Sequence, residues 1–186
     1  MVVGASAGAI DALQQLLPAI AQAEGPPIVA VVHLSPRGKS VLPEVLARRC
    51  PLPVREAEDK QPVASGTVWI APPNYHLLVE PDRTFSFSVD EPVNFSRPSI
   101  DVLFESAADA YGDAVVAVLL TGASADGAAG LARVKLRGGR AIVQDPASAE
   151  CATMPAAGIA ATAVDYVLPL ERIGEHLLSL VDGTRV

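Results

Sequence analysis

The sequence has only two cysteines, Cys50 and Cys151, among its 186 residues. Two cysteines cannot build a disulfide framework, so we expect both to be reduced and to pack as small apolar side chains. Neither has a neighbouring general base in the sequence that would mark a thiol nucleophile, although such a base can come from a distant part of the chain. The class of disulfide-rich secreted domains is therefore excluded.

Long apolar runs and basic segments are also missing. No stretch reaches the roughly 18 apolar residues that a membrane-spanning helix needs, and no basic segment of the kind that opens a signal peptide begins the chain. Lys and Arg number 14 against 21 Asp and Glu, which gives a net charge of −7, and the basic residues are scattered. We therefore expect a cytoplasmic protein that binds neither nucleic acid nor an anionic membrane.

Half of the residues are hydrophobic, which suits one globular domain with a sizeable core over residues 1–186. Short apolar runs alternate with segments of helical periodicity, the pattern of βαβ units. The run at 1–3 resembles the end of a strand whose beginning is missing, so we expect an excised domain or a trimmed chain. Further strands are predicted at 28–34, 114–120, 140–144 and 164–168. Helices are predicted around 10–20, 41–50, 100–108, 127–137, 154–161 and 169–181, the first with Ile10, Leu13, Leu17 and Ile20 on one side.

Residues 51–98 differ, because prolines are frequent there and the apolar runs are short. Short strands are predicted at 67–71, 75–80 and 84–89, with a turn at 80–83 that makes the last two a hairpin. The predicted fold class is thus α/β: a doubly wound, mostly parallel sheet flanked by helices, with a small antiparallel hairpin addition. Such sheets bind their ligands at the carboxyl ends of the strands.

The first candidate for chemistry is Ser6, in the sequence Gly-Ala-Ser-Ala-Gly at the junction of a predicted strand and helix. Small neighbours permit a tight turn, from which Ser6 would project as a nucleophile with the amide of Ala7 directed at a developing oxyanion. The same pattern is also typical of a helix N-cap serine. It resembles a dinucleotide-binding loop less well, since the second strand should then end in an acid rather than in His33.

His33 stands at the carboxyl end of a predicted buried strand, at the sheet edge where Ser6 is expected. That position suits a general base, with a satisfied core histidine as the alternative. His76 follows a proline-rich stretch, where a structural or rim role is expected. His176 lies in the closing helix, on a face that we expect to be solvated.

Asp126 also follows a buried strand and precedes a helix. It suits the carboxylate that orients a catalytic histidine, and it equally suits a helix cap. The competing acid, Asp145, precedes a proline and is typical of an Asp-Pro turn. Because Ser6, His33 and Asp126 all fall at carboxyl ends of predicted parallel strands, the sequence predicts a Ser–His–Asp triad.

At this point the sequence resembles the catalytic domain of chemotaxis protein-glutamate methylesterases (CheB-type). The stretches that carry the resemblance run in order along nearly the whole chain: VVGASAGAIDAL, VVHLSP, AEDKQPV with GTVWIAPPNYHL, RPSIDVLFES, LLTGASADGAAGL, IVQDPASAECATMP and VDYVLPL. This ordered set is far more specific than any one motif.

The resemblance implies a doubly wound α/β fold and hydrolysis of glutamate γ-methyl esters on methyl-accepting chemotaxis receptors. Some members also deamidate receptor glutamines. It implies that Ser6 is the nucleophile, His33 the base and Asp126 the acid, and that the backbone amide of Ala123 belongs to the oxyanion hole. Most members carry an amino-terminal phospho-receiver domain; residues 1–186 hold none, so we expect control by an upstream receiver domain or a separate response regulator.

The chain departs from the family pattern at Ala7, Ala9 and Ala123, where threonine, glycine and methionine are common. These changes affect the lining of the cleft and motivate one alternative, a binding or regulatory module of the same fold that has lost turnover. A hydrolase of small esters, which would share the triad, is a further alternative. Arg97, just before a predicted helix, is expected near the cleft, where it would meet an acidic receptor surface; a plain surface arginine is the alternative.

No cofactor and no metal are expected, because the histidines are far apart and no Cys/His cluster has ligand spacing.

Overall fold

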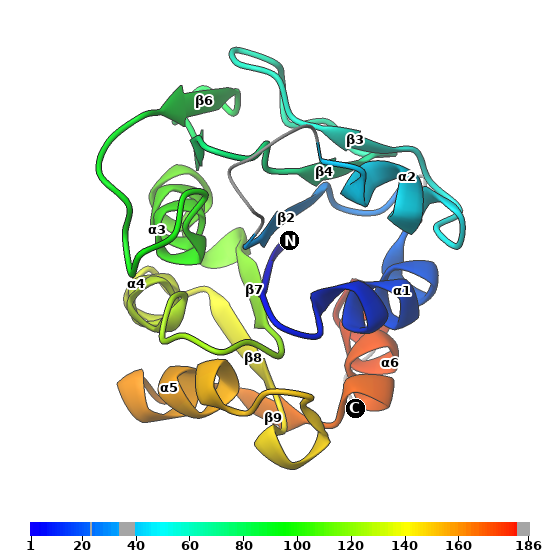
Figure 1. The fold of residues 1–186 in the computed structure, drawn as a ribbon, viewed down its shortest axis with the longest axis vertical. Coiled ribbons are helices and arrows are strands. Elements are labelled where there is room, and N and C mark those ends of the chain that lie inside the picture. Colours follow the sequence, from blue (N-terminus) through cyan, green and yellow to red (C-terminus); the bar gives the residue numbers. More distant parts are fainter. Residues whose placement is uncertain (23, 34–39, 182–186) are drawn as a thin grey trace.

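The computed structural model describes residues 1–22, 24–33 and 40–181 (Figure 1). A seven-stranded sheet has the order β3-β4-β2-β1-β7-β8-β9, with every neighbouring pair parallel, and a separate antiparallel pair is formed by β5 and β6. The strands are β1 (Val2–Ala5), β2 (Ile28–Val32), β3 (Val54–Glu56), β4 (Val68–Ile70), β5 (His76–Val79), β6 (Phe85–Ser88), β7 (Val116–Leu119), β8 (Arg140–Gln144) and β9 (Tyr166–Leu168). The helices are α1 (Ala9–Ile20), α2 (Leu42–Ala47), α3 (Ile100–Tyr111), α4 (Ala128–Leu136), α5 (Thr153–Ala161) and α6 (Leu170–Val181), with short 3-10 turns at Gly112–Ala114 and Pro146–Ser148.

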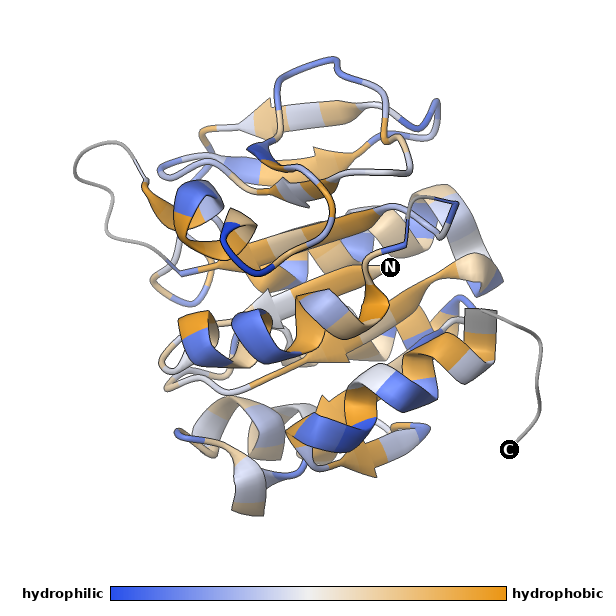
Figure 2. Ribbon diagram, turned by 90° about the vertical axis from the view of Figure 1, so that its right-hand side faces the viewer, coloured by the Kyte–Doolittle hydropathy of each residue, from blue (hydrophilic) through white to orange (hydrophobic). Residues whose placement is uncertain are grey.

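Helices cover both faces of the sheet. One core contains the inner faces of α3, α4 and α5, and the other contains those of α1, α2 and α6. Successive residues of β1 supply both, since Val2 belongs to the first core and Val3 to the second. A strand buried on both faces must be apolar throughout, and Figure 2 shows the orange strands enclosed by helices with blue outer faces. The doubly wound fold class predicted from the sequence is therefore confirmed.

The predicted strands and helices lie within a few residues of the observed ones, with three differences. The strand β3 was not predicted, because Val54 is the one apolar residue among its three. The segment predicted as a strand at 67–71 is β4, which joins the parallel sheet beside β2 rather than the antiparallel addition. Ile10, expected on the buried side of its helix, is 47% exposed, while the predicted end of the second strand at Leu34 lies outside the described residues.

The hairpin of β5 and β6 packs against α3 and is closed by a turn in which the Arg83 amide donates to the Glu80 carbonyl at 2.8 Å. Its connection to α3 matters for the site, because residues 89–99 run from the end of β6 to the start of that helix. In the part of the chain that the structure describes, no helix is long and apolar enough to cross a membrane.

Candidate active site

Three adjacent strands deliver the three residues of the predicted triad to one edge of the sheet. β1 lies between β2 and β7, with Ala5 in register with Val32 and Gly4 with Leu119. Ser6 directly follows β1 and His33 directly follows β2, and the His33 amide donates to the Ala5 carbonyl at 3.3 Å. Since neighbouring strands lie about 4.8 Å apart, the backbones of these two residues are held side by side.

The side chains of His33 and Asp126 form an ion pair, with Nε2 of the ring 2.7 Å from Oδ2 of the carboxylate. The Asp126 side chain is fully buried and the His33 side chain is 13% exposed. A carboxylate in that position fixes the tautomer and orientation of an imidazole. The structure therefore brings together two of the three predicted triad residues.

Asp126 lies against the amino-terminal end of α3 and does not cap α4, whose N-cap is Gly127. Its carboxylate accepts hydrogen bonds from the Ser99 hydroxyl at 2.7 Å, the Ile100 amide at 2.6 Å and the Asp101 amide at 3.2 Å. Amides at the first turn of a helix, together with the helix dipole, stabilise an anion. This explains how a fully buried acid keeps its charge.

The pKa of Asp126 reflects a competition. Burial, the largest effect, opposes ionisation, but the hydrogen bonds from His33, from Ser99 and from the backbone of α3 outweigh it. The pKa of Asp126 therefore lies below its ordinary value, and near neutral pH the group is a carboxylate that accepts from the imidazole.

Ser6 occupies the tight turn between β1 and α1, but its hydroxyl makes no hydrogen bond to His33 within the described residues. The N-cap of α1 is Gly8, with a left-handed φ of 79°, and no side chain caps that helix, so Ser6 is not an N-cap serine. The turn is fixed from β7: the Ser6 amide donates to the Thr121 carbonyl at 2.9 Å, and the Thr121 hydroxyl donates to the Ala7 carbonyl at 2.8 Å.

Two backbone amides near Ser6 are available to an oxyanion. The amides of Ala7 and Ala123 donate to no described residue, and both residues are exposed. The neighbouring amide of Gly122, by contrast, donates to the Cys151 carbonyl at 3.1 Å. The two amides that the sequence singled out are thus free of competing bonds within the described parts of the chain.

A tight turn at residues 93–96 lies over the His33 ring. Two backbone hydrogen bonds between Val93 and Ser96 close it, and both central residues have positive φ, 49° for Asn94 and 62° for Phe95. The Ser96 hydroxyl lies 3.3 Å from Nδ1 of His33. The ring is therefore bonded on both nitrogens, to Asp126 through one and to Ser96 through the other.

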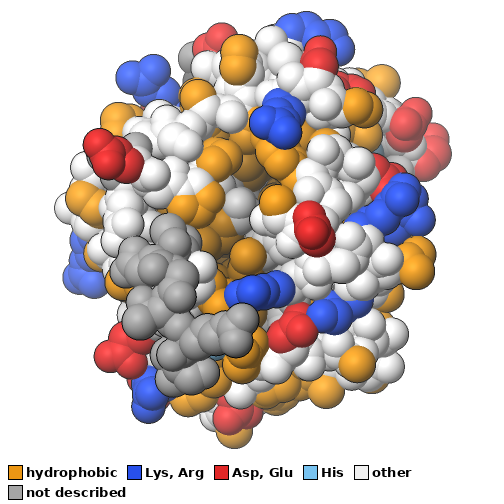
Figure 3. All heavy atoms as spheres, turned by 180° about the vertical axis from the view of Figure 1, so that it is seen from behind, with side chains coloured by type: hydrophobic (Ala, Val, Ile, Leu, Met, Phe, Trp, Pro, Cys, Tyr) orange, Lys and Arg blue, Asp and Glu red, His pale blue; other side chains and the backbone are white. Residues whose placement is uncertain are grey.

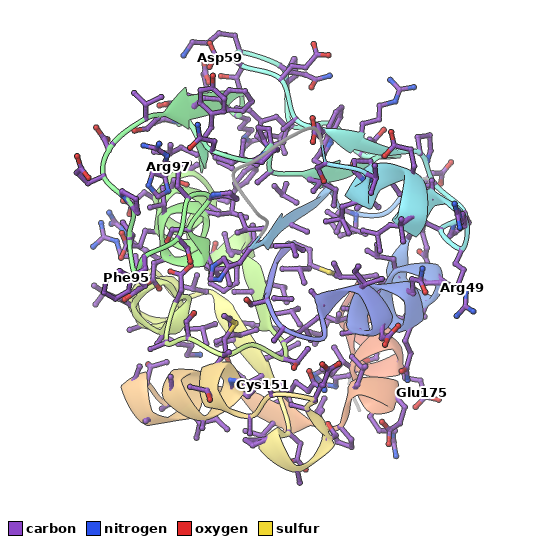
Figure 4. The ribbon with its side chains drawn as sticks, in the orientation of Figure 1. Arg49, Asp59, Phe95, Arg97, Cys151 and Glu175 are labelled. Carbon is purple, nitrogen blue, oxygen red and sulfur yellow. The ribbon has the colours of Figure 1, made fainter. Side chains whose placement is uncertain are left out.

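A cavity of about 180 Å³ opens beside this turn, lined by His33, Asn74, Pro92, Phe95, Ser96, Arg97 and Pro98. Arg97 lines it, as expected near the cleft, but its guanidinium is engaged within the protein. It donates to the carbonyls of Val89 and Asp90 at 2.7 and 2.9 Å and to Oδ1 of Asn74 at 2.9 Å. In Figure 4 Phe95 lies at the periphery of the molecule, near Arg97, and it is fully exposed.

The other candidates from the sequence have structural partners. His76 is buried, accepts from the Ser99 amide through Nδ1 and lies 3.2 Å from the Glu91 carbonyl through Nε2. His176, expected on a solvated face, is instead half-buried against the ring of Tyr166. Asp145 caps a short turn by accepting from the Ala147 amide. Among the described residues no group of His, Cys, Asp and Glu has the arrangement of a metal site.

The opposite face of the molecule is hollowed as well, and hydrophobic side chains line the hollow (Figure 3). A cavity of about 220 Å³ at the amino ends of β1 and β2 has mainly apolar walls, including Val2, Pro27, Val79 and Tyr111. Its described lining holds no nucleophile–base pair, which leaves the carboxyl edge of the sheet as the place for chemistry.

Several residues of the site were not predicted. Asn94, Ser96 and Asp101 contact His33 or Asp126 through side chains, or contact one another. Thr121 and Gln144 form a buried support for the Ser6 turn, since Oε1 of Gln144 accepts from the Thr121 amide at 2.9 Å. Asp101, Thr121 and Gln144 do lie in stretches that carry the family resemblance, RPSIDVLFES, LLTGASADGAAGL and IVQDPASAECATMP, but nothing in those stretches assigned them a role.

The fold and the site define a doubly wound α/β protein with the His–Asp pair and adjacent serine of a serine hydrolase. Residues 1–177 match the model of the CheB methylesterase family, and the chain belongs to that family.

Known proteins agree with this assignment. A Leptospira interrogans protein, provisionally named a protein-glutamate methylesterase/protein-glutamine glutaminase, is 52% identical over 97% of this chain and 93% of its own. The methylesterase FrzG of Myxococcus xanthus is 39% identical over 97% of this chain, which spans 54% of FrzG. The crystal structure of the Thermotoga maritima CheB methylesterase catalytic domain has a TM-score of 0.92 and 34% identity, covering 97% of both chains.

Proposed function

We propose that this chain hydrolyses the γ-methyl esters of glutamate side chains, with Ser6 as nucleophile, His33 as general base and Asp126 as the acid that orients it. The observation that carries the proposal is the His33–Asp126 ion pair of 2.7 Å. His33 follows β2, which pairs with β1, the strand that Ser6 follows. The family assignment supports the reaction class. It also removes the basis of the dinucleotide-binding alternative.

The reaction proceeds through an acyl-enzyme. His33 takes the proton of Ser6 while the serine oxygen bonds to the ester carbonyl carbon, and the carbonyl oxygen becomes an oxyanion. The amides of Ala7 and Ala123 stabilise it, each contributing about 3–4 kcal/mol as judged from other oxyanion holes. Collapse breaks the bond to methoxide, which takes the proton from His33 and leaves as methanol. Water, activated by His33, then releases the glutamate carboxylate and restores Ser6.

The structure also offers a second candidate nucleophile. Nε2 of His33 is engaged by Asp126, so Nδ1 is the nitrogen that remains for proton transfer, and the Ser96 hydroxyl lies 3.3 Å from it. For Ser6 to act, its hydroxyl must replace that of Ser96 at this nitrogen. We favour Ser6, because it lies in the turn between β1 and α1, next to the Ala7 amide, which donates to no described residue.

The substrates that fit the family are methyl-accepting chemotaxis receptors, with deamidation of receptor glutamines as a second activity. Several relatives carry names that combine both activities, among them the Leptospira protein and a Hahella chejuensis protein 43% identical over 92% of this chain and 48% of its own. The cytoplasm, and control by a receiver domain or a separate response regulator, belong to the same proposal.

Methanol release from methylated receptor membranes tests the proposal with three proteins: the unchanged chain, Ser6→Ala and Ser96→Ala. We expect release to be lost in Ser6→Ala alone, and a fluorophosphonate to label Ser6, identified by peptide mass spectrometry. Equal release from the unchanged chain and Ser6→Ala would support a module without turnover. Loss in Ser96→Ala together with label on Ser96 would assign the nucleophile to the turn.

A further inference from the structure

A second buried carboxyl lies behind the His33–Asp126 pair. Asp101 is 5% exposed and Asp126 is 0% exposed, and the side-chain amide of Asn94 connects them. Its Nδ2 donates to Oδ2 of Asp101 at 2.9 Å and to Oδ1 of Asp126 at 3.3 Å. An amide nitrogen has two hydrogens, so both are committed to carboxylates and the Asn94 amide is held between them.

The two carboxyls have unequal environments. Asp126 accepts from His33, Ser99 and the first amides of α3 in addition to Asn94, whereas the one other donor to Asp101 within the described residues is the Gly130 amide at 2.7 Å. No cation faces Asp101 among these residues.

Because their environments differ, the pKa values of Asp101 and Asp126 shift in opposite directions. Burial raises the pKa of Asp101 to about 6, and the charges of Asp126 and Glu105 add to the effect. The pKa of Asp126, which faces His33, is lowered. When the pKa values of two neighbouring acids differ in this way, one acid stays ionised while the other gains or loses its proton near the pH at which the protein works.

The turn that carries Asn94 is held by its side-chain contacts. Phe95 occupies a left-handed conformation that non-glycine residues rarely adopt, and its fully exposed side chain gains nothing from packing. The contacts of Asn94 with the carboxyls and of Ser96 with His33 therefore hold this strained turn in place.

We propose that Asp101 is a positioning residue for the triad acid: through the shared Asn94 amide, the ionised Asp101 carboxylate fixes the orientation of Asp126 and hence of His33. The inference rests on the proposed function and adds a dependence of turnover on the charge of Asp101. The ionised group also adds negative charge close to the imidazolium that forms during the reaction, which stabilises that cation. Protonation of Asp101 removes this charge and weakens the hydrogen bond from Asn94, because a neutral carboxyl is a poorer acceptor than a carboxylate.

The test is the ratio of kcat for Asp101→Asn to kcat of the unchanged chain, measured by methanol release between pH 5 and pH 8.5. Taking the ratio removes those effects of pH that are common to both proteins. We expect the ratio to be near one at pH 5, where Asp101 is protonated and as neutral as asparagine. It should fall about 3- to 10-fold above pH 7, the size of one ordinary hydrogen bond. KM should change little, because Asp101 does not reach the cleft.

A second variant tests the bridge itself. In Asn94→Gly, glycine adopts the positive φ that the turn requires but lacks the side-chain amide. The ratio of kcat for this variant to kcat of the unchanged chain should therefore also fall as the pH rises. Lys60→Gly, at a left-handed residue (φ 63°) of another turn, serves as the matched control and should give a ratio of one throughout.

A ratio for Asp101→Asn that is flat with pH, whether reduced or not, overturns the inference, since a merely structural defect would not follow the ionisation of Asp101. If the ratio depends on pH for Asp101→Asn but not for Asn94→Gly, the Asn94 amide does not carry the effect of Asp101 to Asp126. Failure of the proposed function is recognised separately, by methanol release that does not depend on Ser6.

Discussion

Nε2 of His33 lies 2.7 Å from Oδ2 of Asp126, although the two residues are 93 positions apart in the chain. The contact joins the end of β2 to the loop after β7 across the intervening strand β1. It is also linked to α3, because the same carboxylate accepts from the first amides of that helix. The order of the strands and the first turn of α3 thus together position the Asp126 side chain.

The substitution Asp126→Asn will test this arrangement directly. A neutral amide in place of the carboxylate could no longer accept from the imidazole as an anion, so the tautomer needed by the base is lost and the imidazolium is unsupported. We expect kcat for methanol release to fall about 10⁴-fold, as in other triads. Circular dichroism establishes that the variant is folded, and a loss below about tenfold would remove Asp126 from the triad.

Replacement of Asp101 by asparagine should make stability less sensitive to pH. The pKa of Asp101 is raised from 3.8 to about 6 in the folded protein, so the fold binds its proton more tightly than the unfolded chain does. The resulting stability is fully present below pH 3.8 and is lost as the pH rises through about 6. The gain in unfolding free energy on mutation should therefore be larger at pH 8 than at pH 3.5, by up to about 3 kcal/mol.

Urea unfolding at the two pH values measures this difference. Asp82→Asn is the control, because Asp82 is exposed and its pKa is lowered, chiefly by a hydrogen bond from the Thr84 side chain. For Asp82→Asn, the change in unfolding free energy on mutation should be no more favourable at pH 8 than at pH 3.5. The same result for Asp101→Asn would mean that Asp101 ionises as freely as in the unfolded chain.

Replacement of Arg97 by lysine should loosen the wall of the cleft. The guanidinium joins two carbonyls of the 89–90 segment to the side chain of Asn74, and a single ammonium cannot reproduce this fork. We expect a loss of about 1–2 kcal/mol in local stability, the size of one or two hydrogen bonds. Hydrogen exchange of the amides at 89–97 measures it, and unchanged exchange would show that Arg97 does not hold the segment.

Replacement of Phe95 by glycine should stabilise the protein, although it removes an aromatic side chain. The side chain is fully exposed and its backbone has a φ of 62°, a conformation that costs a non-glycine residue about 1 kcal/mol. Part of that gain is offset by the greater freedom of glycine in the unfolded chain, which leaves an expected increase of about 0.5 kcal/mol in urea unfolding. A clear decrease would mean that the Phe95 ring makes a stabilising contact.

The sequence was sufficient for the sheet and for the edge at which the site lies. β2 and β7 lie in continuous apolar runs, so their burial and their parallel character follow from composition alone. The ends of such runs gave the positions of His33 and Asp126, whose contact the structure then shows. By contrast, β3 has one apolar residue among its three, so no apolar run marks it as a strand.

The polar residues around the pair were beyond prediction for a different reason. Asn94 and Ser96 act from a turn whose two positive φ values occur at an asparagine and a phenylalanine, where sequence rules favour glycine. Asp101 resembles any acidic residue in the first turn of a helix, and its burial follows from the packing of α3 against α4. Such contacts depend on tertiary structure that no local pattern encodes.

The pairing of β1 with β2 has a consequence for how the domain tolerates change. Ser6 and His33 are placed by the hydrogen bonds of one parallel ladder, so insertions in surface connections at the far edge of the sheet leave their spacing untouched. A shift of that ladder by two residues would instead separate them by about 6.6 Å. The interior of the domain, more than its loops, is where the chemistry is most vulnerable to mutation.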